Sequence, residues 1–175
     1  METPNWCDNE LTVAGPEADL EAFFQKAQEG NRFGKPCQLS FNPFVPYPKR
    51  YEDMDVLARK WDKQNKNKND WKDRPKDGYN SGGYEWCITH WGTKWDADLR
   101  DWRSKKRSLW YNFMTAWSPP EAVVQAMSKQ FPKLKFTLKF WECGVGFKGS
   151  LIVKGGETIK RQVLQYSPTR NWRGG

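Results

Sequence analysis

The 175-residue sequence lacks any apolar run long enough to cross a membrane, so we expect no transmembrane helix and no membrane partner. Its first five residues, Met-Glu-Thr-Pro-Asn, have neither the basic flank nor the apolar stretch of a secretion signal. We therefore expect a cytoplasmic protein. The length suits a single domain, which would bury about 70% of its unfolded surface.

Histidine and closely spaced cysteines are also scarce. The chain has one histidine, His90, and its cysteines stand far apart at positions 7, 37, 87 and 143. Common zinc sites draw on closely spaced pairs of cysteine or histidine, and this spacing matches none of them. We expect structural thiols, no metal and no cofactor.

Acidic residues become rare toward the C-terminus, and the whole chain carries a net charge of +8. Residues 1–58 hold ten acidic and five basic residues, whereas residues 129–175 hold ten basic residues and two acidic ones. Residues 59–107 hold fourteen basic and eight acidic residues. A chain polarised in this way can present a basic surface to a polyanion. The alternative is that basic loops only keep the protein soluble.

A strand, a proline and a helix follow one another twice, at residues 10–18 and 111–122. The first helix is expected to have Gly15 as its cap and Pro16 at its first position. For the second, Ser118 is the expected cap, Pro119 the first helical residue, and Glu121 the partner that completes a capping box. Apolar residues then recur at helical spacing, namely Leu20, Phe23, Phe24 and Ala27 in the first copy and Val123, Val124, Met127 and Phe131 in the second.

Strand patterns surround these helices. Residues 134–140 alternate apolar residues with lysine or threonine, which predicts a half-buried strand with a basic outer face. Further strands are predicted at residues 10–14, 84–91 and 109–117, and a hairpin at residues 145–165 around Gly155-Gly156. Residues 55–64 fit a short helix. The rest of the segment from about 55 to 80 is rich in lysine and asparagine, which predicts an insertion or mobile flap.

Three short strings lie beside the predicted ends of these elements: Pro-Asn-Trp-Cys at 4–7, His-Trp-Gly-Thr-Lys-Trp-Asp at 90–96, and Thr-Ala-Trp-Ser-Pro-Pro at 115–120. With these strings in this order, the chain resembles the YubB-type ferredoxin-like family of phage and plasmid proteins. The resemblance implies an α+β fold with a β-α-β-β-α-β antiparallel sheet and two helices, a mobile-element origin, and no assigned catalytic residue. We expect one domain at residues 1–166 with the long insertion and an added C-terminal β-hairpin, then a flexible tail at 167–175.

Two patterns suggest chemistry that their context argues against. Residues 144–149 match G-x-G-x-x-G, but a strand pattern follows the glycines where a dinucleotide site needs a helix N-terminus, so we expect a tight turn or bulge. Asp96, Asp98 and Asp101 stand among basic residues, which favours mutual ion pairs over a metal-dependent nuclease site.

The segment from Trp91 to Trp110 is the best candidate for function. Its tryptophans are interleaved with basic residues, and single-stranded nucleic acid is commonly held by basic side chains on phosphates and aromatic rings under bases. Tryptophan and arginine are also favoured at protein–protein interfaces, so a protein target is a second possibility. The third is that the tryptophans belong to the core and the basic residues form a solvated rim. The basic outer face of the strand near residue 135 adds a second set. The predicted binding residues are therefore Lys94, Arg100, Trp102, Arg103, Lys105, Lys106, Arg107, Lys133, Lys135 and Lys139.

We therefore expect a non-enzymatic binding protein that engages a bacterial nucleic acid or a nucleic-acid-handling complex in the host cytoplasm. An anti-CRISPR or anti-restriction role is suggested by analogy with the implied mobile-element origin. One alternative is a metal-independent ribonuclease centred on His90, although the sequence shows no nucleophile and base beside it. The other is a phage structural or replication accessory protein.

Overall fold

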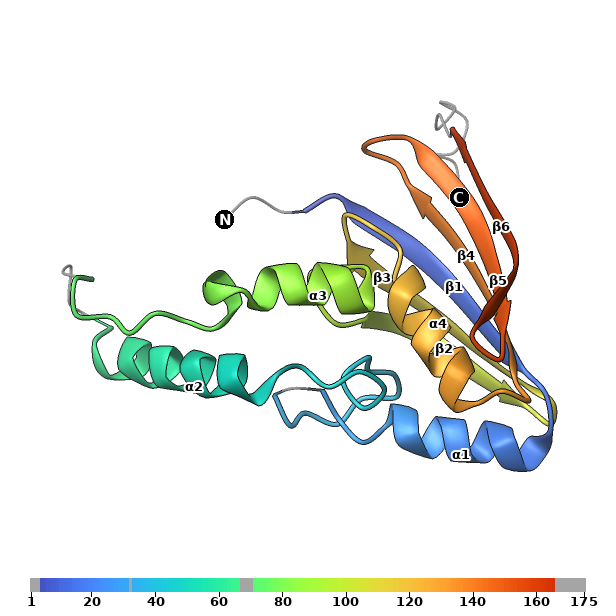
Figure 1. Ribbon diagram of the computed structural model, residues 1–175, viewed down its shortest axis with the longest axis horizontal. Helices are drawn as coiled ribbons and strands as arrows, with labels where there is room; N and C mark the ends of the chain where they lie inside the picture. Colours follow the sequence, from blue (N-terminus) through green and yellow to red (C-terminus); the bar gives the residue numbers. More distant parts are fainter. Residues whose placement is uncertain (1–3, 32, 67–70, 166–175) are drawn as a thin grey trace.

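Six strands form one antiparallel sheet in the computed structural model, which describes residues 4–31, 33–66 and 71–165. The strands are β1 (Trp6–Ala14), β2 (Asp98–Lys105), β3 (Ser108–Ala116), β4 (Lys135–Glu142), β5 (Phe147–Lys154) and β6 (Glu157–Gln165). Their order across the sheet is β2-β3-β1-β4-β5-β6, as Figure 1 shows. The expected α+β class and antiparallel sheet are confirmed.

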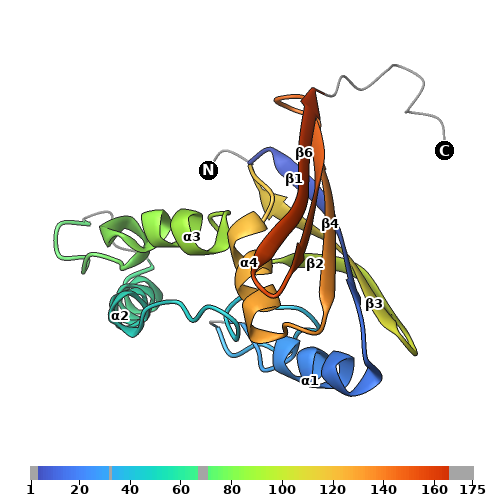
Figure 2. The same cartoon turned by 45° about the vertical axis from the view of Figure 1, so that its right-hand side comes forward.

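The described helices lie on one side of this sheet. They are α1 (Glu17–Ala27), α2 (Lys49–Gln64), the 3-10 turn η1 (Tyr79–Ser81), α3 (Gly83–Trp91) and α4 (Glu121–Gln130). Figure 2 shows the sheet close to edge-on, with α1 and α4 against it and with α2 and α3 reaching out from the same side. The opposite side of the sheet has no described helix over it, and we call it the open face.

The core lies between the sheet and the helices because alternate strand residues point toward them. In β1, Leu11 and Val13 are fully buried, while Thr12 between them is partly exposed, and this alternation runs through the strand. The apolar stripe of α1 meets this layer through Phe23, whose ring centroid lies 5.5 Å from that of Phe136 on β4 and 5.1 Å from that of Phe44. The apolar residues that recur at strand spacing in β1 and at helical spacing in α1 therefore pack into one core.

The predicted strand at residues 84–91 is wrong, because these residues form α3. Its buried positions are Gly83, Cys87 and Trp91, four residues apart, as a helix with one buried side requires. Gly92, with a φ angle of 85°, ends the helix in the left-handed conformation, and Gly82, with a φ angle of 118°, ends the 3-10 turn η1 just before it. The edge strand next to β3 is β2, at residues 98–105. It has exposed side chains on both faces, so its sequence lacks the alternation of apolar and polar residues that predicts a strand.

The predicted cap of the second helix is also wrong. Helix α4 begins at Glu121 after Pro120, and no side chain caps it. The Ser118 hydroxyl donates a hydrogen bond to the carbonyl of Gly92 at 2.6 Å instead of to the helix. Helix α1 begins at Glu17, one residue later than expected.

The predicted short helix of the insertion exists as α2, which begins at Lys49, six residues before the expected start. Arg74 ties the following segment to it, with Nε 2.8 Å from a carboxylate oxygen of Asp62 and Nη1 3.1 Å from one of Asp77. Part of the lysine- and asparagine-rich run, residues 67–70, lies outside the described residues, and so does the predicted tail at 167–175. None of the described helices combines the length and the apolar character needed to cross a membrane.

Candidate nucleic-acid interface

Four lysines of β4 and β5 share the open face. Lys135 and Lys139 alternate with buried residues of β4, so they point away from the helices. Lys154 lies opposite Lys135 in the register of β4 with β5, and Lys148 lies opposite Trp141 on the same side. All four lysines are exposed, and we call this set the basic face. The open-face positions of these two strands include no acidic residue.

A depression of about 690 Å³ lies at the end of the sheet below the basic face. Arg107 from the β2–β3 turn, Lys133 from the α4–β4 connection, and Lys135 and Lys154 of the basic face all line it. A backbone hydrogen bond joins two segments that line the depression, because the Gly15 amide donates to the Arg107 carbonyl at 3.3 Å. The depression therefore brings together Arg107 and Lys133, which belong to the two separate basic segments predicted from the sequence.

The charges of β2 are more nearly balanced. Arg100 lies 2.9 Å from Asp98, and Arg103 lies 3.2 Å from Asp101, so the expected ion pairs of these two aspartates are confirmed. Both pairs are exposed, and each contributes at most about 1 kcal/mol. Lys105 and Lys106 are exposed at the end of β2 and in the turn after it.

Asp96 has a structural role through its hydrogen bonds. Its carboxylate accepts hydrogen bonds from the Ser40 hydroxyl at 2.6 Å and from the Phe41 amide at 2.7 Å. It also accepts one from the Ala97 amide at 2.8 Å. These bonds join the loop before β2 to the segment that follows α1.

Two of the predicted binding residues lie away from the basic face. The Trp102 ring is on the helix side of the sheet, with its centroid 5.0 Å from that of Phe24, so it packs against α1. Lys94 lies in the connection after α3, with its ammonium 4.3 Å from the Trp95 ring centroid and 5.6 Å from that of Trp117. We leave both residues out of the candidate interface.

A groove of about 620 Å³ lies on the open face over β4, β5 and β6. Trp141, Lys139 and Lys148 line it together with Ser150 and Gln162. On the β1 side, Glu10 lies opposite Lys139 in the strand register and also lines the groove. Sequence reasoning missed Trp141, Lys148 and Lys154, although Lys148, Ser150, Ile152 and Lys154 alternate along β5 as the lysines of β4 do.

The three strings that carry the family resemblance meet at one joint in the fold. The Trp117 amide donates to the Asn5 carbonyl at 2.8 Å, and the Thr93 hydroxyl donates to the Ala116 carbonyl at 3.0 Å. The hydrogen bond from Ser118 to Gly92 adds a third link between them. The strings therefore hold α3 and the ends of β1 and β3 together, which is an architectural role.

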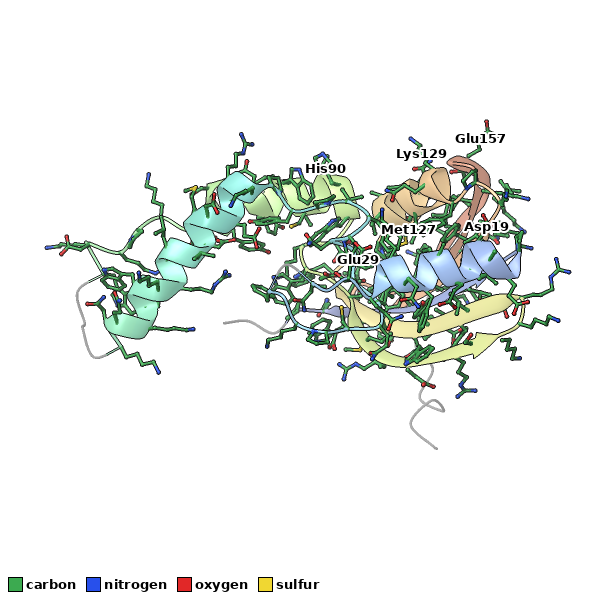
Figure 3. The ribbon with its side chains drawn as sticks, turned by 90° about the horizontal axis from the view of Figure 1, so that it is seen from below. Asp19, Glu29, His90, Met127, Lys129 and Glu157 are labelled. Carbon is green, nitrogen blue, oxygen red and sulfur yellow. The ribbon has the colours of Figure 1, made fainter. Side chains whose placement is uncertain are left out.

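His90 is exposed in the last turn of α3, on the side turned away from the sheet, as Figure 3 shows. Its Nδ1 lies 2.9 Å from the Trp86 carbonyl, and its ring stacks on that of Trp86 with a centroid distance of 4.5 Å. Among the described residues, no serine, cysteine or carboxylate makes a hydrogen bond or ion pair with it. A ribonuclease centre would need such a partner.

The other candidates for chemistry also have structural roles. Burial, with Asp8 and Glu142 nearby, raises the pKa of the Cys7 thiol to about 12, so the thiol stays protonated near neutral pH. In the part of the chain that the structure describes, no three His, Cys, Asp or Glu side chains are grouped to hold a metal. The glycine motif forms the β4–β5 turn, where the buried Glu142 carboxylate accepts hydrogen bonds from the amides of Gly144 and Val145, both at 2.6 Å.

Comparison with known proteins supports the fold. Residues 90–169 match the model of a family described as the ferredoxin-like domain in Api92-like protein. The crystal structure of a protein api92 from Yersinia pseudotuberculosis is similar with a TM-score of 0.54 and 10% sequence identity, over 95% of this chain and 100% of that chain. At this identity the likeness concerns the fold alone. No curated protein matches. The part of the chain from residue 90 to residue 169 is thus similar to the ferredoxin-like domain of Api92-like proteins.

Proposed function

We propose that the protein binds nucleic acid without cleaving it, through the open face of its sheet. The observation that carries the proposal is the basic face, where Lys135, Lys139, Lys148 and Lys154 are exposed together and no acidic residue shares the open-face positions of their strands. Lysines placed in this way can replace the counterions of phosphates, which supplies affinity for any sequence. The depression lined by Arg107 and Lys133 extends the same charge around the end of the sheet, where Lys133 Nζ also lies 3.8 Å from a carboxylate oxygen of Asp19.

The topology explains how this face arises. We read β1, α1, β2, β3, α4 and β4 as the β-α-β-β-α-β unit, with β5 and β6 as an added hairpin and with the segment from α2 to α3 as an insertion. In this reading the hairpin widens the sheet beyond β4 and contributes two of the four lysines, Lys148 and Lys154. The hairpin would thus convert one basic strand into a basic surface.

The acidic residues of the open face set a limit to this surface. Asp8 and Glu10 lie on β1, and the pKa of Asp8 is raised because the effect of burial outweighs that of the nearby Arg100. Since carboxylates repel phosphates, we place the backbone of the nucleic acid over β4 and β5, with β1 at its margin. A role against a host defence complex rests on the family resemblance alone and stays a prediction.

Fluorescence anisotropy with labelled single-stranded and duplex oligonucleotides tests the proposal. We expect binding that weakens as salt rises from about 50 to 200 mM, with a log–log slope near −3 on single strands if the four lysines each contact a phosphate. Intact oligonucleotide at the end of the incubation would exclude cleavage. The absence of binding at low salt would contradict the proposal. Partners captured from a bacterial lysate that persist after nuclease treatment would then indicate a protein target.

A further inference from the structure

We infer that the groove on the open face holds an unpaired nucleobase against Trp141, so that the protein prefers single strands to duplexes. This inference rests on the proposed function and adds the class of nucleic acid. The tryptophan rings on the open face differ in what covers them. The Trp110 ring is covered by Arg103, whose guanidinium carbon lies 5.3 Å from the ring centroid, and the Trp6 ring packs against Trp95 at 6.1 Å.

The Trp141 ring differs from these two. Within the described part of the chain, it has no aromatic ring contact and no cation over its face. It is only half-buried, and it lines a groove of about 620 Å³, a size within the usual range of small-ligand sites. A flat apolar ring that lines an open groove is a surface on which any nucleobase can stack.

Cations flank this ring on two sides. Lys148 is the direct cross-strand neighbour of Trp141, so their Cβ atoms lie about 5 Å apart. Lys139 is two residues away along β4 on the same face, which places it about 7 Å from Trp141. On the other side the cross-strand neighbour of Trp141 is Asp8 of β1, so the phosphates beside a base stacked on Trp141 would lie toward β5, within reach of Lys139 and Lys148.

Polar groups around the ring can meet the edge of the base. Ser150 and Gln162, which are opposite one another on β5 and β6, have side chains without a hydrogen-bond partner among the described residues. Glu10, on the β1 side, can only accept hydrogen bonds when ionised, so it favours bases that carry an amino group. In a duplex the base faces are stacked and the pairing edges are occupied, so a paired base cannot enter the groove in this way.

The test compares Trp141→Leu with Trp110→Leu, an equally outward-facing tryptophan outside the groove, on a mixed-sequence single strand and on its duplex. We expect the parent to bind the single strand more tightly at equal salt. Trp141→Leu should weaken single-strand binding about 5- to 100-fold, leave duplex binding within about twofold, and leave the salt slope unchanged, because stacking is lost and the phosphate contacts are not. Trp110→Leu should change neither affinity.

Several outcomes would overturn the inference while leaving the proposed function intact. These are an unchanged single-strand affinity in Trp141→Leu, an equal loss on both nucleic acids, or an equal loss of single-strand binding in Trp110→Leu. If the parent binds neither nucleic acid, the proposed function itself fails. Should Trp141→Leu not fold, ultraviolet crosslinking of a bromouracil-substituted single strand to the parent decides the question. The crosslinked peptide should contain Trp141, and a crosslink only outside the groove would overturn the inference.

Discussion

Replacing Lys135, Lys139, Lys148 and Lys154 with glutamine removes the whole basic face and tests the proposed function at its central observation. Each phosphate contact contributes about 0.7 to the log–log salt slope on single strands and about 0.9 on duplex DNA. Four contacts therefore predict a slope flatter by about 3 on single strands and by somewhat more on duplexes. Between about 50 and 200 mM salt, the parent should lose about 50-fold more single-strand affinity than the variant does.

A matched control separates the position of the charges from their number. Lys60, Lys63, Lys66 and Lys76 are also exposed, but they belong to the insertion, away from the sheet. Changing them to glutamine lowers the net charge of +8 by the same four charges. Anisotropy titrations at several salt concentrations, with thermal unfolding as a check on folding, compare the two variants. An unchanged slope in the basic-face variant, or the same flattening in both variants, would refute the reasoning.

Three further predictions concern stability and the lone histidine. Ser118→Ala should lower the free energy of unfolding in urea by about 1 kcal/mol, because the hydrogen bond to Gly92 is lost, and an unchanged value would contradict this role. His90→Ala should keep nucleic-acid binding and lower the free energy of unfolding by about 1 kcal/mol or less, since the ring is exposed but stacks on Trp86, whereas a folded variant that loses binding or activity would promote the ribonuclease alternative. Gly149→Ala should lower the free energy of unfolding by about 1–3 kcal/mol, because the added Cβ would lie 2.5 Å from the Phe140 ring. A variant that unfolds at the same temperature as the parent would contradict this close packing.

The parts of the fold predicted correctly are those in which burial leaves a periodic trace. Helices α1 and α4 each bury one apolar stripe, and β4 alternates apolar residues with lysine or threonine. Helix α3 misled the prediction because Tyr84, Trp86 and Ile88 alternate as in a strand and belong to residue types common in strands. Gly92 carried the correct signal, since a left-handed glycine commonly follows the C-terminus of a helix.

The site was predicted only in part, because its completion depends on strand pairing. Alternation along β4 places Lys135 and Lys139 on one face without knowledge of the neighbouring strands. The sequence did not indicate that Lys154 and Lys148 would stand opposite β4, or that Trp141 would have an uncovered ring, because both follow from the register with β5. Trp102 was predicted to bind because basic residues stand near it in the sequence, but its ring packs against Phe24 of α1.

The distribution of charge along the chain is a weaker guide to binding than its distribution over the surface. Residues 59–107 are strongly basic in sequence, yet Arg74 lies between Asp62 and Asp77, and Arg100 and Arg103 each contact an aspartate. Figure 1 also shows α2 at the end of the molecule opposite β5 and β6, so the cations of the insertion cannot act together with those of the hairpin on a short strand of nucleic acid. The lysines of residues 129–175 are fewer, but four of them on β4 and β5 share one face, with Lys160 of β6 beside them. Because a phosphate chain responds to cations that it can reach at the same time, we expect this C-terminal group to dominate the salt dependence of binding.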